Sequence, residues 1–540
     1  MAACGTDNAE RCSDSDRVLS FYRNSTILLT GGTGFLGKVL LEKILRCLSV
    51  RKVFLAVRVK DGRKPAERLQ ELLKDVLFNR LRHDTSIEQL LERIEPVEIS
   101  LEADGVGLGM DDSTEARLLQ ETELIFNVLA SVKFNESIKN AVGTNVGGTR
   151  RVLLLARRMQ RLKAVVHVST LYSNCDRPHI EERVYDDTLL TPDSVLMLSN
   201  LLSAGEMDGL QHCLLGSLPN TYTFSKKCAE SLIQQEYHDL PVGIFRPPIV
   251  LSTYREPIAG WTDNLNGPAG LCLWTVKGYV RVIHGNGSKR ANLVPVDYCV
   301  NAMLVACFDV AARSTGRRRM SADQLAAGGG KSWEPAQPVP VYNYLYARPN
   351  LTWGRYMSSV SMGFDGWIKR LCWHHSYAIV SNRTLFRLLS LCCHTVPACL
   401  LDFVRQLRGK RPFYRRMVSK TNRFLETMSY FGLREWQIAN ANVVRLRTLL
   451  TPNEASLLEF DLSTVDWDEY FQGYIPGIRR YFLAEPAAKE RRACSTLSLG
   501  WNRRIQFLCQ LFHKLIWVLI CLKLGHRLYV ARNLFSILIS

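Results

Sequence analysis

The chain has no CxxC pair and no cluster of cysteines and histidines at zinc-binding spacing, although 16 of its 540 residues are cysteines. This absence argues against a zinc module or a dithiol redox pair, and we predict no metal site. Scattered single thiols are typical of a reduced, cytosol-facing protein whose cysteines lie mostly in the core. The polar and acidic residues 1–16 do not have the composition of a secretory signal peptide.

An excess of acidic residues is also missing, because 51 Asp and Glu stand against 69 Lys and Arg, a formal net charge of +18. Such a basic balance favours anionic partners: nucleic acid, an acidic membrane surface or a phosphate-rich small molecule. No nucleic-acid-binding motif accompanies the charge, so we predict no nucleic-acid partner.

Long apolar runs are scarce as well. Residues 515–522 and 534–539 are apolar, but both runs are shorter than the ~20 residues of a membrane-spanning helix. The chain is too long for one compact core, so at least two domains are expected. We predict the following parts: a polar tail (1–24), a first domain (25–312), an Arg-, Gly-, Ala- and Pro-rich linker or insertion (313–340), a helical second domain (341–484) and a membrane-associating tail (485–540).

Continuous apolar segments alternate with helical patterns through the first domain. We expect strands at 26–29, 53–57, 124–126 and 164–168, with helices at 39–45 and 152–159. Alternation of fully apolar strands with helices is typical of a parallel sheet covered on both faces. The predicted fold class is therefore α/β: a doubly wound, Rossmann-type parallel sheet with a smaller, mainly helical C-terminal domain.

A glycine-rich loop directly follows the first strand and precedes the first helix. The loop consists of Thr30, Gly31, Gly32, Thr33, Gly34, Phe35, Leu36 and Gly37. Three glycines at this spacing allow a tight turn, close approach of a pyrophosphate and close helix packing, and the helix N-terminus attracts phosphate. The order strand, motif, helix predicts that all eight residues bind a dinucleotide.

The end of the second strand predicts which dinucleotide is bound. NAD-binding domains usually carry an acidic residue there for the ribose 2′-hydroxyl. This chain has Arg58 and Lys60 instead, which would neutralise a 2′-phosphate, so we predict NADPH as the cofactor. The alternative is that both are ordinary solvated charges at the start of a loop.

Tyr222 and Lys226 are four residues apart and therefore share one face of a helix. A cation beside a phenol is expected to lower the tyrosine pKa from ~10 toward neutrality, so that the phenol donates a proton to a carbonyl as hydride arrives. Ser169 and Thr170 end an earlier strand, where doubly wound sheets build their sites, and can donate to the same oxygen. The alternative for this pair is simple strand capping.

Asn145 is expected inside a helix, where asparagine is unfavourable unless its amide has a partner. A role in proton relay, a bend in the helix, or a hydrogen-bonded buried amide would each explain it. We count Asn145 among the candidate cofactor-binding residues.

Together these residues resemble an extended short-chain dehydrogenase/reductase and, more narrowly, the fatty acyl-CoA reductases. Family-like segments run from Ser25 to Leu483 and include 126–134, 167–174, 246–250 and 293–297. The string at 260–268, GWTDNLNGP, is the most specific of them. Segments near 396–398, 409–412, 465–470 and 477–481 resemble the sterile-type C-terminal domain of these reductases.

The resemblance implies reduction of a long-chain fatty acyl-CoA to a primary alcohol through an aldehyde, with two NADPH consumed and CoA released. Tyr222 would donate the proton, Lys226 would tune it and hold the nicotinamide ribose, and Ser169 or Thr170 would orient the substrate carbonyl. Ala130 and Pro247 join the candidate cofactor-binding residues.

The chain departs from the family at the expected adenine site. Leu101 and Glu102 replace a Gly-Asp pair, and Leu129 stands where the family prefers alanine. Glu102 would substitute for the aspartate, whereas Leu101 and Leu129 are expected to weaken cofactor binding.

A basic stretch follows an apolar one in the second domain. Eight Lys and Arg occur between Arg405 and Arg423 with no acid among them, just after the apolar residues 388–404. The alternatives are a solvated helix face or a cradle for anionic headgroups or CoA phosphates. We expect a membrane-associated protein with a cytosol-facing catalytic domain, at the endoplasmic reticulum or the peroxisome, and the sequence allows a homo-oligomer.

Two other functions stay open at this point. One is a different extended short-chain oxidoreductase, which the 260–268 string and the second domain argue against. The other is a non-catalytic relative that binds NADP or lipid, which Leu101 and Leu129 favour but the intact Tyr222 and Lys226 oppose.

Overall fold

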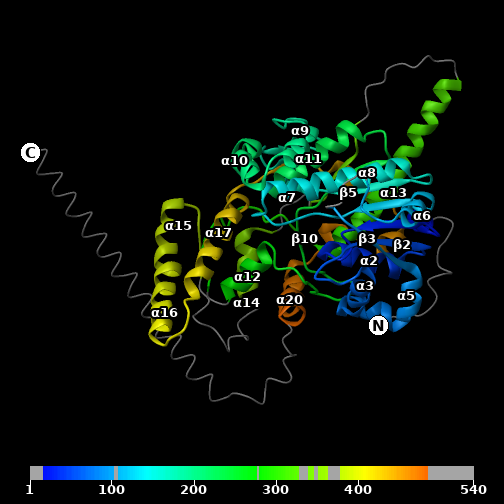
Figure 1. The fold of residues 1–540 in the computed structure, drawn as a ribbon. Helices are drawn as coiled ribbons and strands as arrows, with labels where there is room; N and C mark the ends of the chain where they lie inside the picture. The colour runs from blue at the N-terminus through cyan, green and yellow to red at the C-terminus, as the bar shows by residue number, and fades with distance from the viewer. Residues whose placement is uncertain are drawn as a thin grey trace, which may run out of the picture. The chain divides into compact units, whose positions relative to one another are not determined.

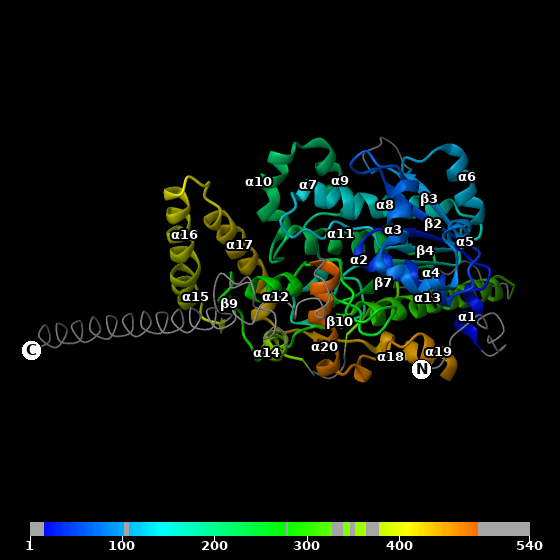
Figure 2. The same ribbon diagram turned by 90° about the horizontal axis from the view of Figure 1, so that it is seen from below.

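The computed structural model describes residues 16–101, 107–276, 279–326, 338–345, 351–362 and 377–483 (Figures 1 and 2). The chain forms two compact units, and neither is continuous in sequence. Unit 1 contains residues 1–264, 288–356 and 430–483, and unit 2 contains residues 265–287, 357–429 and 484–540. Two helices cross the boundary between the units, α14 (Trp353–Met362) and α17 (Tyr414–Leu433).

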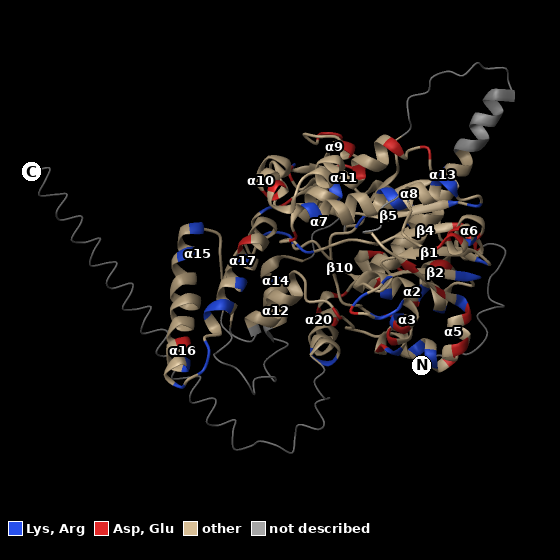
Figure 3. Cartoon of the chain, viewed as in Figure 1, with Lys and Arg blue, Asp and Glu red and all other residues tan. Residues whose placement is uncertain are grey.

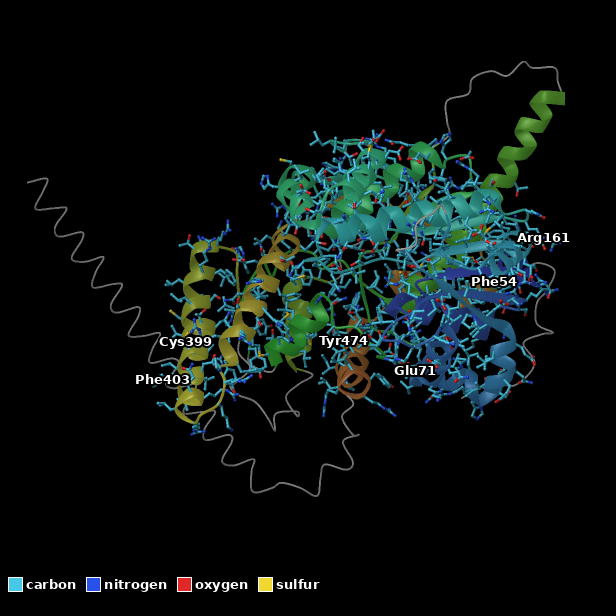
Figure 4. The ribbon with its side chains drawn as sticks, in the orientation of Figure 1. Phe54, Glu71, Arg161, Cys399, Phe403 and Tyr474 are labelled. Atoms are coloured by element: carbon cyan, nitrogen blue, oxygen red, sulfur yellow. The ribbon has the colours of Figure 1, made fainter. Side chains whose placement is uncertain are left out.

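Unit 1 is built on a seven-stranded parallel sheet with the order β11-β7-β5-β4-β1-β2-β3. Its strands are β1 (Thr26–Thr30), β2 (Lys52–Arg58), β3 (Ile94–Ile99), β4 (Leu124–Asn127), β5 (Ala164–Val168), β7 (Val242–Arg246) and β11 (Val341–Asn343). Leu28, Phe54, Ile125, Val165 and Ile244 from its strands lie in one buried core, and Phe54 is labelled in Figure 4. Chain order reverses between β1 and β4, the position where doubly wound sheets bind their ligands.

Helices cover both faces of this sheet (Figures 1 and 2). One face carries α2 (Phe35–Cys47) and α13 (Val296–Ala326), which pack against each other, and α1 (Arg17–Tyr22) packs on α13. The other carries α8 (Gly148–Arg158) and α11 (Thr221–Glu236), with α6 (Asp112–Glu121) against α8. A π-helical turn, η2 (Gly143–Gly147), joins α7 (Ile138–Val142) to α8.

Shorter elements complete unit 1. The helices are α3 (Pro65–Lys74), η1 (Val76–Phe78), α4 (Asn79–Asp84), α5 (Ile87–Arg93), η3 (Leu171–Asn174), α9 (Pro192–Leu201), α10 (Ala204–Leu215), α18 (Ala441–Arg447), α19 (Pro452–Leu457), η5 (Leu462–Thr464), α20 (Trp467–Gly477) and η6 (Ile478–Phe482). Two small parallel pairs join β10 (Leu293–Pro295) to β8 (Ile249–Leu251) and β13 (Gln437–Ile438) to β6 (His179–Ile180).

Unit 2 contains a helical hairpin. Its first arm is a continuous helix made of α15 (Arg383–Ser390), the π-helical turn η4 (Leu391–Thr395) and α16 (Val396–Leu407). The α17 helix returns beside this arm (Figures 1 and 2). The rest of the unit includes α12 (Pro268–Val276) and a parallel pair of β9 (Val282–His284) and β12 (Ala378–Val380).

Most of the expected elements of the first domain are present within one or two residues, and the α/β fold class is confirmed. The expected linker from residue 313 differs from the structure, because α13 continues through Ala326. Arginine and alanine favour helix, so the composition of this stretch extends the helix past its buried part. The domain boundaries expected at 312 and 341 do not coincide with the two units, since residues 341–356 and 430–483 belong to unit 1.

Candidate functional site

The glycine loop is shaped by close backbone contacts. Gly31 has a φ of +69°, and a Cβ on it would lie 2.7 Å from the carbonyl carbon of Val128 at the end of β4. A Cβ on Gly37 would lie 2.3 Å from the Gly31 carbonyl oxygen, so the first turn of α2 can pack this close to the loop only with glycine at this position. The loop therefore lies against the end of β4 with its backbone at the N-terminus of α2, as a dinucleotide site requires.

A row of buried polar side chains supports the same edge of the sheet. Thr30, Asn127 and His167 are in register on β1, β4 and β5. The Thr30 hydroxyl donates to the Asn127 side-chain oxygen Oδ1 (2.8 Å), and the Asn127 side-chain nitrogen Nδ2 faces His167 Nδ1 (3.1 Å). Burial and the nearby Lys226 hold the pKa of His167 well below its usual value, so this row is neutral.

Arg58 and Lys60 lie at the end of β2, both exposed, as the sequence predicts. A further cation that the sequence analysis did not single out joins them. The Arg68 guanidinium on α3 donates to the Arg58 carbonyl oxygen and to the Thr33 hydroxyl of the glycine loop (3.4 Å). Partial burial, Arg58 and Arg63 lower the pKa of Arg68, while Asp61 and Glu71 oppose the shift.

The two family departures lie together. A Cβ on Gly148 of α8 would meet Leu129 Cδ2 at 3.3 Å and Leu101 Cδ2 at 3.7 Å, so both leucines pack over this glycine. Leu129 is buried and Leu101 is partly buried. The absence of a side chain at Gly148 gives room for the larger Leu129, which is directed toward α8. Glu102 lies outside the described residues, and Ala130 follows β4, partly buried.

Tyr222, Thr170 and Lys226 come together at the end of β5. Tyr222 and Lys226 lie on α11, which begins at a cap in which the Asn220 side chain accepts from the Thr223 N–H (2.9 Å). The Lys226 ammonium donates to the Val168 carbonyl (2.7 Å), and the Thr170 hydroxyl is hydrogen-bonded with Tyr222. Pro247 at the end of β7 accepts from the Leu171 N–H (3.0 Å), which holds the Thr170 loop in place.

The expectation that Tyr222 has a lowered pKa is not met in this structure. Burial raises the pKa of Tyr222 to about 12, and the Thr170 hydrogen bond opposes the change. Burial lowers the pKa of Lys226 to about 8, while Glu230 opposes that shift. The physical reason is that burial outweighs charge here, and the ammonium of Lys226 is directed to a backbone carbonyl.

Ser169 differs from its expected role. Its hydroxyl donates to Glu230 Oε1. Glu230 also accepts from Ser173 (2.9 Å) and forms an ion pair with Arg246 (Nη2–Oε2 2.6 Å), and all four side chains are buried. Ser169 therefore belongs to a buried ionic network behind the catalytic candidates.

Asn145 lies in the π-helical turn η2 and is fully buried. Its side-chain oxygen Oδ1 accepts from the Ser131 N–H (2.8 Å), and its side-chain amide donates to the Ser131 carbonyl (3.1 Å) and the Ser225 hydroxyl (2.9 Å). Of the three explanations left open by the sequence, the structure shows a helix irregularity and a hydrogen-bonded amide together. Asn145 fixes the residue after Ala130 and the helix that carries Tyr222.

An aromatic cluster lies beside the phenol. The Phe134 ring lies 5.8 Å from that of Tyr222 and 6.0 Å from that of Phe431, which in turn contacts Tyr172 (4.8 Å). Trp436 closes the group, donating from its indole N–H to the Cys175 carbonyl (3.0 Å). The surroundings of the Tyr222 ring are therefore largely apolar on this side.

The specific string at 260–268 begins against the glycine loop. The Trp261 ring stacks on Phe35 at 5.7 Å, and Asp263 forms an ion pair with Lys38 (2.9 Å). Gly260, with a φ of +75°, contacts Gly473 and Gly477 of α20. These contacts give the string a structural role in holding the start of α2.

Sequence reasoning missed Arg68, Glu230 and Arg246. Glu230 had a usable signal, because Tyr222, Lys226 and Glu230 repeat every four residues on one helix face. Arg68 had none, since its position depends on how α3 folds back on β2. Across the described ranges there is no group of three His, Cys, Asp or Glu side chains able to hold a metal ion.

A parallel doubly wound sheet with a glycine loop after β1 and a Tyr–Lys pair at the end of β5 defines an oxidoreductase of the short-chain dehydrogenase/reductase type. Family models agree: the NAD-binding model described as Male sterility protein matches residues 29–303, and a second model of that description matches residues 393–485. Curated relatives that are 32% identical over 87% and 97% of this chain carry the name fatty acyl-CoA reductase, and the chain belongs to that family.

Relatives match over nearly the whole chain. Fatty acyl-CoA reductase wat of Drosophila melanogaster is 32% identical over 474 residues, 87% of each chain. Fatty acyl-CoA reductase 1 of Rattus norvegicus is 32% identical over 531 residues, 97% of this chain and 96% of that one. Among solved structures, the terminal R domain of the myxalamid PKS-NRPS pathway has a TM-score of 0.53 at 19% identity, covering 89% of this chain and 98% of that chain, which shows the shared fold.

Proposed function

We propose that the protein reduces long-chain fatty acyl-CoA to the primary alcohol through an aldehyde, using NADPH and releasing CoA. The observation that carries the proposal is the placement of Tyr222, Thr170 and Lys226 at the end of β5, on the sheet edge where the glycine loop follows β1. The relatives that match over nearly the full chain carry the name fatty acyl-CoA reductase, which supports the substrate class.

The residues present fit a dinucleotide. Gly31 and Gly37 carry no side chains, and an added Cβ on either would clash with neighbouring backbone. Because the loop has no side chains at these positions, a pyrophosphate can approach its backbone closely. Arg58, Lys60 and Arg68 put positive charge at the end of β2 and beside Thr33, which favours a ribose 2′-phosphate and hence NADPH over NADH. When bound, NADPH supplies hydride to the substrate carbonyl carbon.

Side chains of the protein would donate the proton to the carbonyl oxygen of the substrate and stabilise the donor. Tyr222, protonated at neutral pH because burial raises its pKa, donates its O–H proton to that oxygen as the carbon accepts hydride. Thr170 fixes the phenol through their hydrogen bond. Lys226 follows Tyr222 by one helical turn on α11 and supplies a positive charge on the same helix face. The aromatic cluster around Phe134 and Phe431 limits water on one side of the reacting carbon.

Two rounds of this step account for the overall reaction. In the first round the thioester carbon gains hydride and its oxygen gains a proton, and the adduct then releases CoA as the thiol and leaves an aldehyde. In the second round the aldehyde gains hydride and a proton to give the alcohol. The sum consumes two NADPH and two protons for each acyl-CoA.

We also propose association with a membrane, where long-chain substrates reside. Within the described part of the chain, the continuous helix from Arg383 to Leu407 is long and apolar enough to cross a membrane by length and composition. The compartment, endoplasmic reticulum or peroxisome, and a homo-oligomeric state stay predictions from the sequence.

The test is NADPH oxidation by the full chain in detergent with palmitoyl-CoA, with products identified by mass spectrometry. Hexadecanol that disappears in Tyr222→Phe is the expected result. NADPH binding without turnover across chain lengths would favour a different short-chain oxidoreductase activity. Absence of NADPH binding would favour the non-catalytic relative.

A further inference from the structure

One arm of the unit 2 hairpin carries an apolar stripe that the structure leaves exposed. The seven residues of the stripe are between 45% and 71% exposed: Leu385, Leu388, Leu391, Val396, Leu400, Phe403 and Leu407. Their spacing of three or four residues places them on one helix face. The single step of five, from Leu391 to Val396, falls on the π-helical turn η4, whose extra residue keeps the two halves of the stripe in line.

The opposite face of the same arm packs against the rest of unit 2. Phe386, His394, Ala398 and Asp402 are buried there. His394 accepts from the backbone N–H groups of Arg281 (2.9 Å) and Val282 (3.2 Å), which ties the arm to β9. Packing inside the unit thus accounts for one face of the arm and leaves the apolar stripe on the other, where Cys399 and Phe403 are labelled on α16 (Figure 4).

The turn of the hairpin is rich in basic residues and is fixed by hydrogen bonds to a buried aspartate. Asp402 accepts from the backbone N–H groups of Phe413 (2.8 Å), Tyr414 (2.9 Å) and Arg415 (2.8 Å), which fixes the start of α17. The Arg405 guanidinium lies over the Phe413 ring at 5.9 Å, and Phe413 is 51% exposed. An exposed aromatic ring among cations is the composition of membrane-interface anchors.

The charge around the stripe is predominantly positive. Residues 377–429 contain ten Lys and Arg against two acids, Asp402 and Glu426, and Asp402 is buried. The basic residues gather at the ends of the α15–α16 arm and along α17, while the middle of the arm is neutral (Figure 3). The ten are Arg383, Arg387, Arg405, Arg408, Lys410, Arg411, Arg415, Arg416, Lys420 and Arg423.

We propose that this hairpin docks on an anionic phospholipid surface, with the apolar stripe and Phe413 in the headgroup–acyl boundary and the cations on lipid phosphates. The inference rests on the proposed membrane association and assigns it to a surface. The hairpin lies on the membrane and does not cross it, because Arg415, Arg416, Lys420 and Arg423 of α17 are exposed beside the apolar arm and could not enter hydrocarbon.

The test uses the full chain and vesicles of phosphatidylcholine with or without phosphatidylserine. Hydroxyl-radical footprinting with mass spectrometry reads the exposure of Phe403, Leu407 and Phe413 separately from any other membrane contact of the chain. We expect protection of these three side chains on phosphatidylserine vesicles and its reversal at high salt. Protein that binds the vesicles while the three stay exposed would overturn the proposal, and so would protection that depends on protein concentration without vesicles, which indicates a second copy.

Two variants separate the contribution of the cations to membrane binding from that of the apolar stripe. Arg408→Gln with Lys410→Gln and Arg411→Gln should weaken binding to phosphatidylserine vesicles by about a hundredfold, from ~1 kcal/mol for each surface cation. Leu400→Ser with Phe403→Ser and Leu407→Ser should abolish the protection of Phe413, which is the reporter that this variant keeps. The matched control replaces Leu189, Met197 and Leu201 by serine, which are 63% to 74% exposed in unit 1, and should leave the footprint unchanged.

Reductase activity in detergent distinguishes this proposal from the proposed function. All three variants should retain it, because none of the substituted residues lies at the Tyr222 site. A chain without activity that still shows the footprint would overturn the reaction and keep the docking surface. An active chain without the footprint would overturn the docking surface and keep the reaction.

Discussion

Glu230 and Arg246 form an ion pair whose side chains are 1% and 0% exposed, one helical turn beyond Lys226. A buried carboxylate this close keeps the pKa of Lys226 from falling further than about 8, since it stabilises the ammonium. Ser169, Ser173 and Asn174 satisfy the remaining lone pairs of the carboxylate. The pair therefore holds Ser169 at the end of β5 and also stabilises the charge of Lys226, the lysine of the candidate site.

This relationship predicts the pH dependence of reduction. The Lys226 ammonium is present below its pKa of about 8 and is lost as the pH rises through it, so kcat/KM should fall above pH ~8. Glu230→Gln removes the charge that raises this pKa, so the alkaline limb should move to lower pH. A pH–rate profile measures the shift.

The control variant also removes the charge of Arg246, so that no unpaired charge stays buried. Because Glu230→Gln leaves Arg246 unpaired, the single variant should also lose stability, by about 3–5 kcal/mol. Adding Arg246→Gln should recover most of that loss and leave the shifted pH limb. An unchanged limb in both variants would contradict the electrostatic role and leave a purely structural one.

Thr170 and Ser169 should behave differently despite being neighbours. Thr170→Val removes the hydrogen bond to Tyr222 and should lower kcat by about a hundredfold, the lower end of the effect of a positioned proton donor. Ser169→Ala removes one of several hydrogen bonds to Glu230 and should cost about 1 kcal/mol of stability with a small change in kcat. Equal losses of kcat would show that the assignment of the two hydroxyls is wrong.

Arg68 should determine the choice of dinucleotide together with Arg58. Arg68→Ala should raise the KM for NADPH by about tenfold or more and leave the KM for NADH nearly unchanged, since the lost contact is to a phosphate. Arg63→Ala is the matched control, because Arg63 is exposed and paired with Glu71 (2.6 Å). Similar effects on both dinucleotides would indicate that Arg68 only supports the glycine loop.

The contact between Gly260 and α20 should be sensitive to one methyl group. A Cβ on Gly477 would lie 1.8 Å from the Gly260 carbonyl oxygen, so Gly477→Ala should cost about 1–3 kcal/mol of unfolding free energy. Gly473→Ala is the control, since its Cβ would lie 3.8 Å from that of Ala259. Denaturant unfolding of the two variants measures the difference, and equal stability would contradict the close approach.

The sheet and the glycine loop were predictable because they depend on local pattern. Apolar strands repeat with helices, and Gly31 and Gly37 are required by contacts with neighbours a few residues away or on the next strand. The Tyr–Lys pair was found for the same reason, since four residues make one helical turn. The contact of Ser169 with Glu230 was not predictable, because Glu230 lies 61 residues away and only the packed fold brings them together.

The pKa of Tyr222 and the conformation of residues 313–326 are two further features that the sequence alone could not predict. Spacing reveals that a cation is near Tyr222 but not how deeply both groups are buried, and burial decides the direction of the shift. The composition of residues 313–326 favours both linker and helix, and continuation of α13 decides between them. The packing of Leu129 against Gly148 was not predictable, because Gly148 lies on a different element.

The central claim is that Tyr222 and Lys226 support two successive hydride transfers to the carbonyl carbon of an acyl-CoA. The most direct measurement incubates the full chain in detergent with palmitoyl-CoA and NADPH deuterated at the transferred position, and locates the label by mass spectrometry. The account predicts hexadecanol with both deuterium atoms on carbon 1 and none of it in Tyr222→Phe. Unlabelled product, or the same labelled alcohol from Tyr222→Phe, would contradict it.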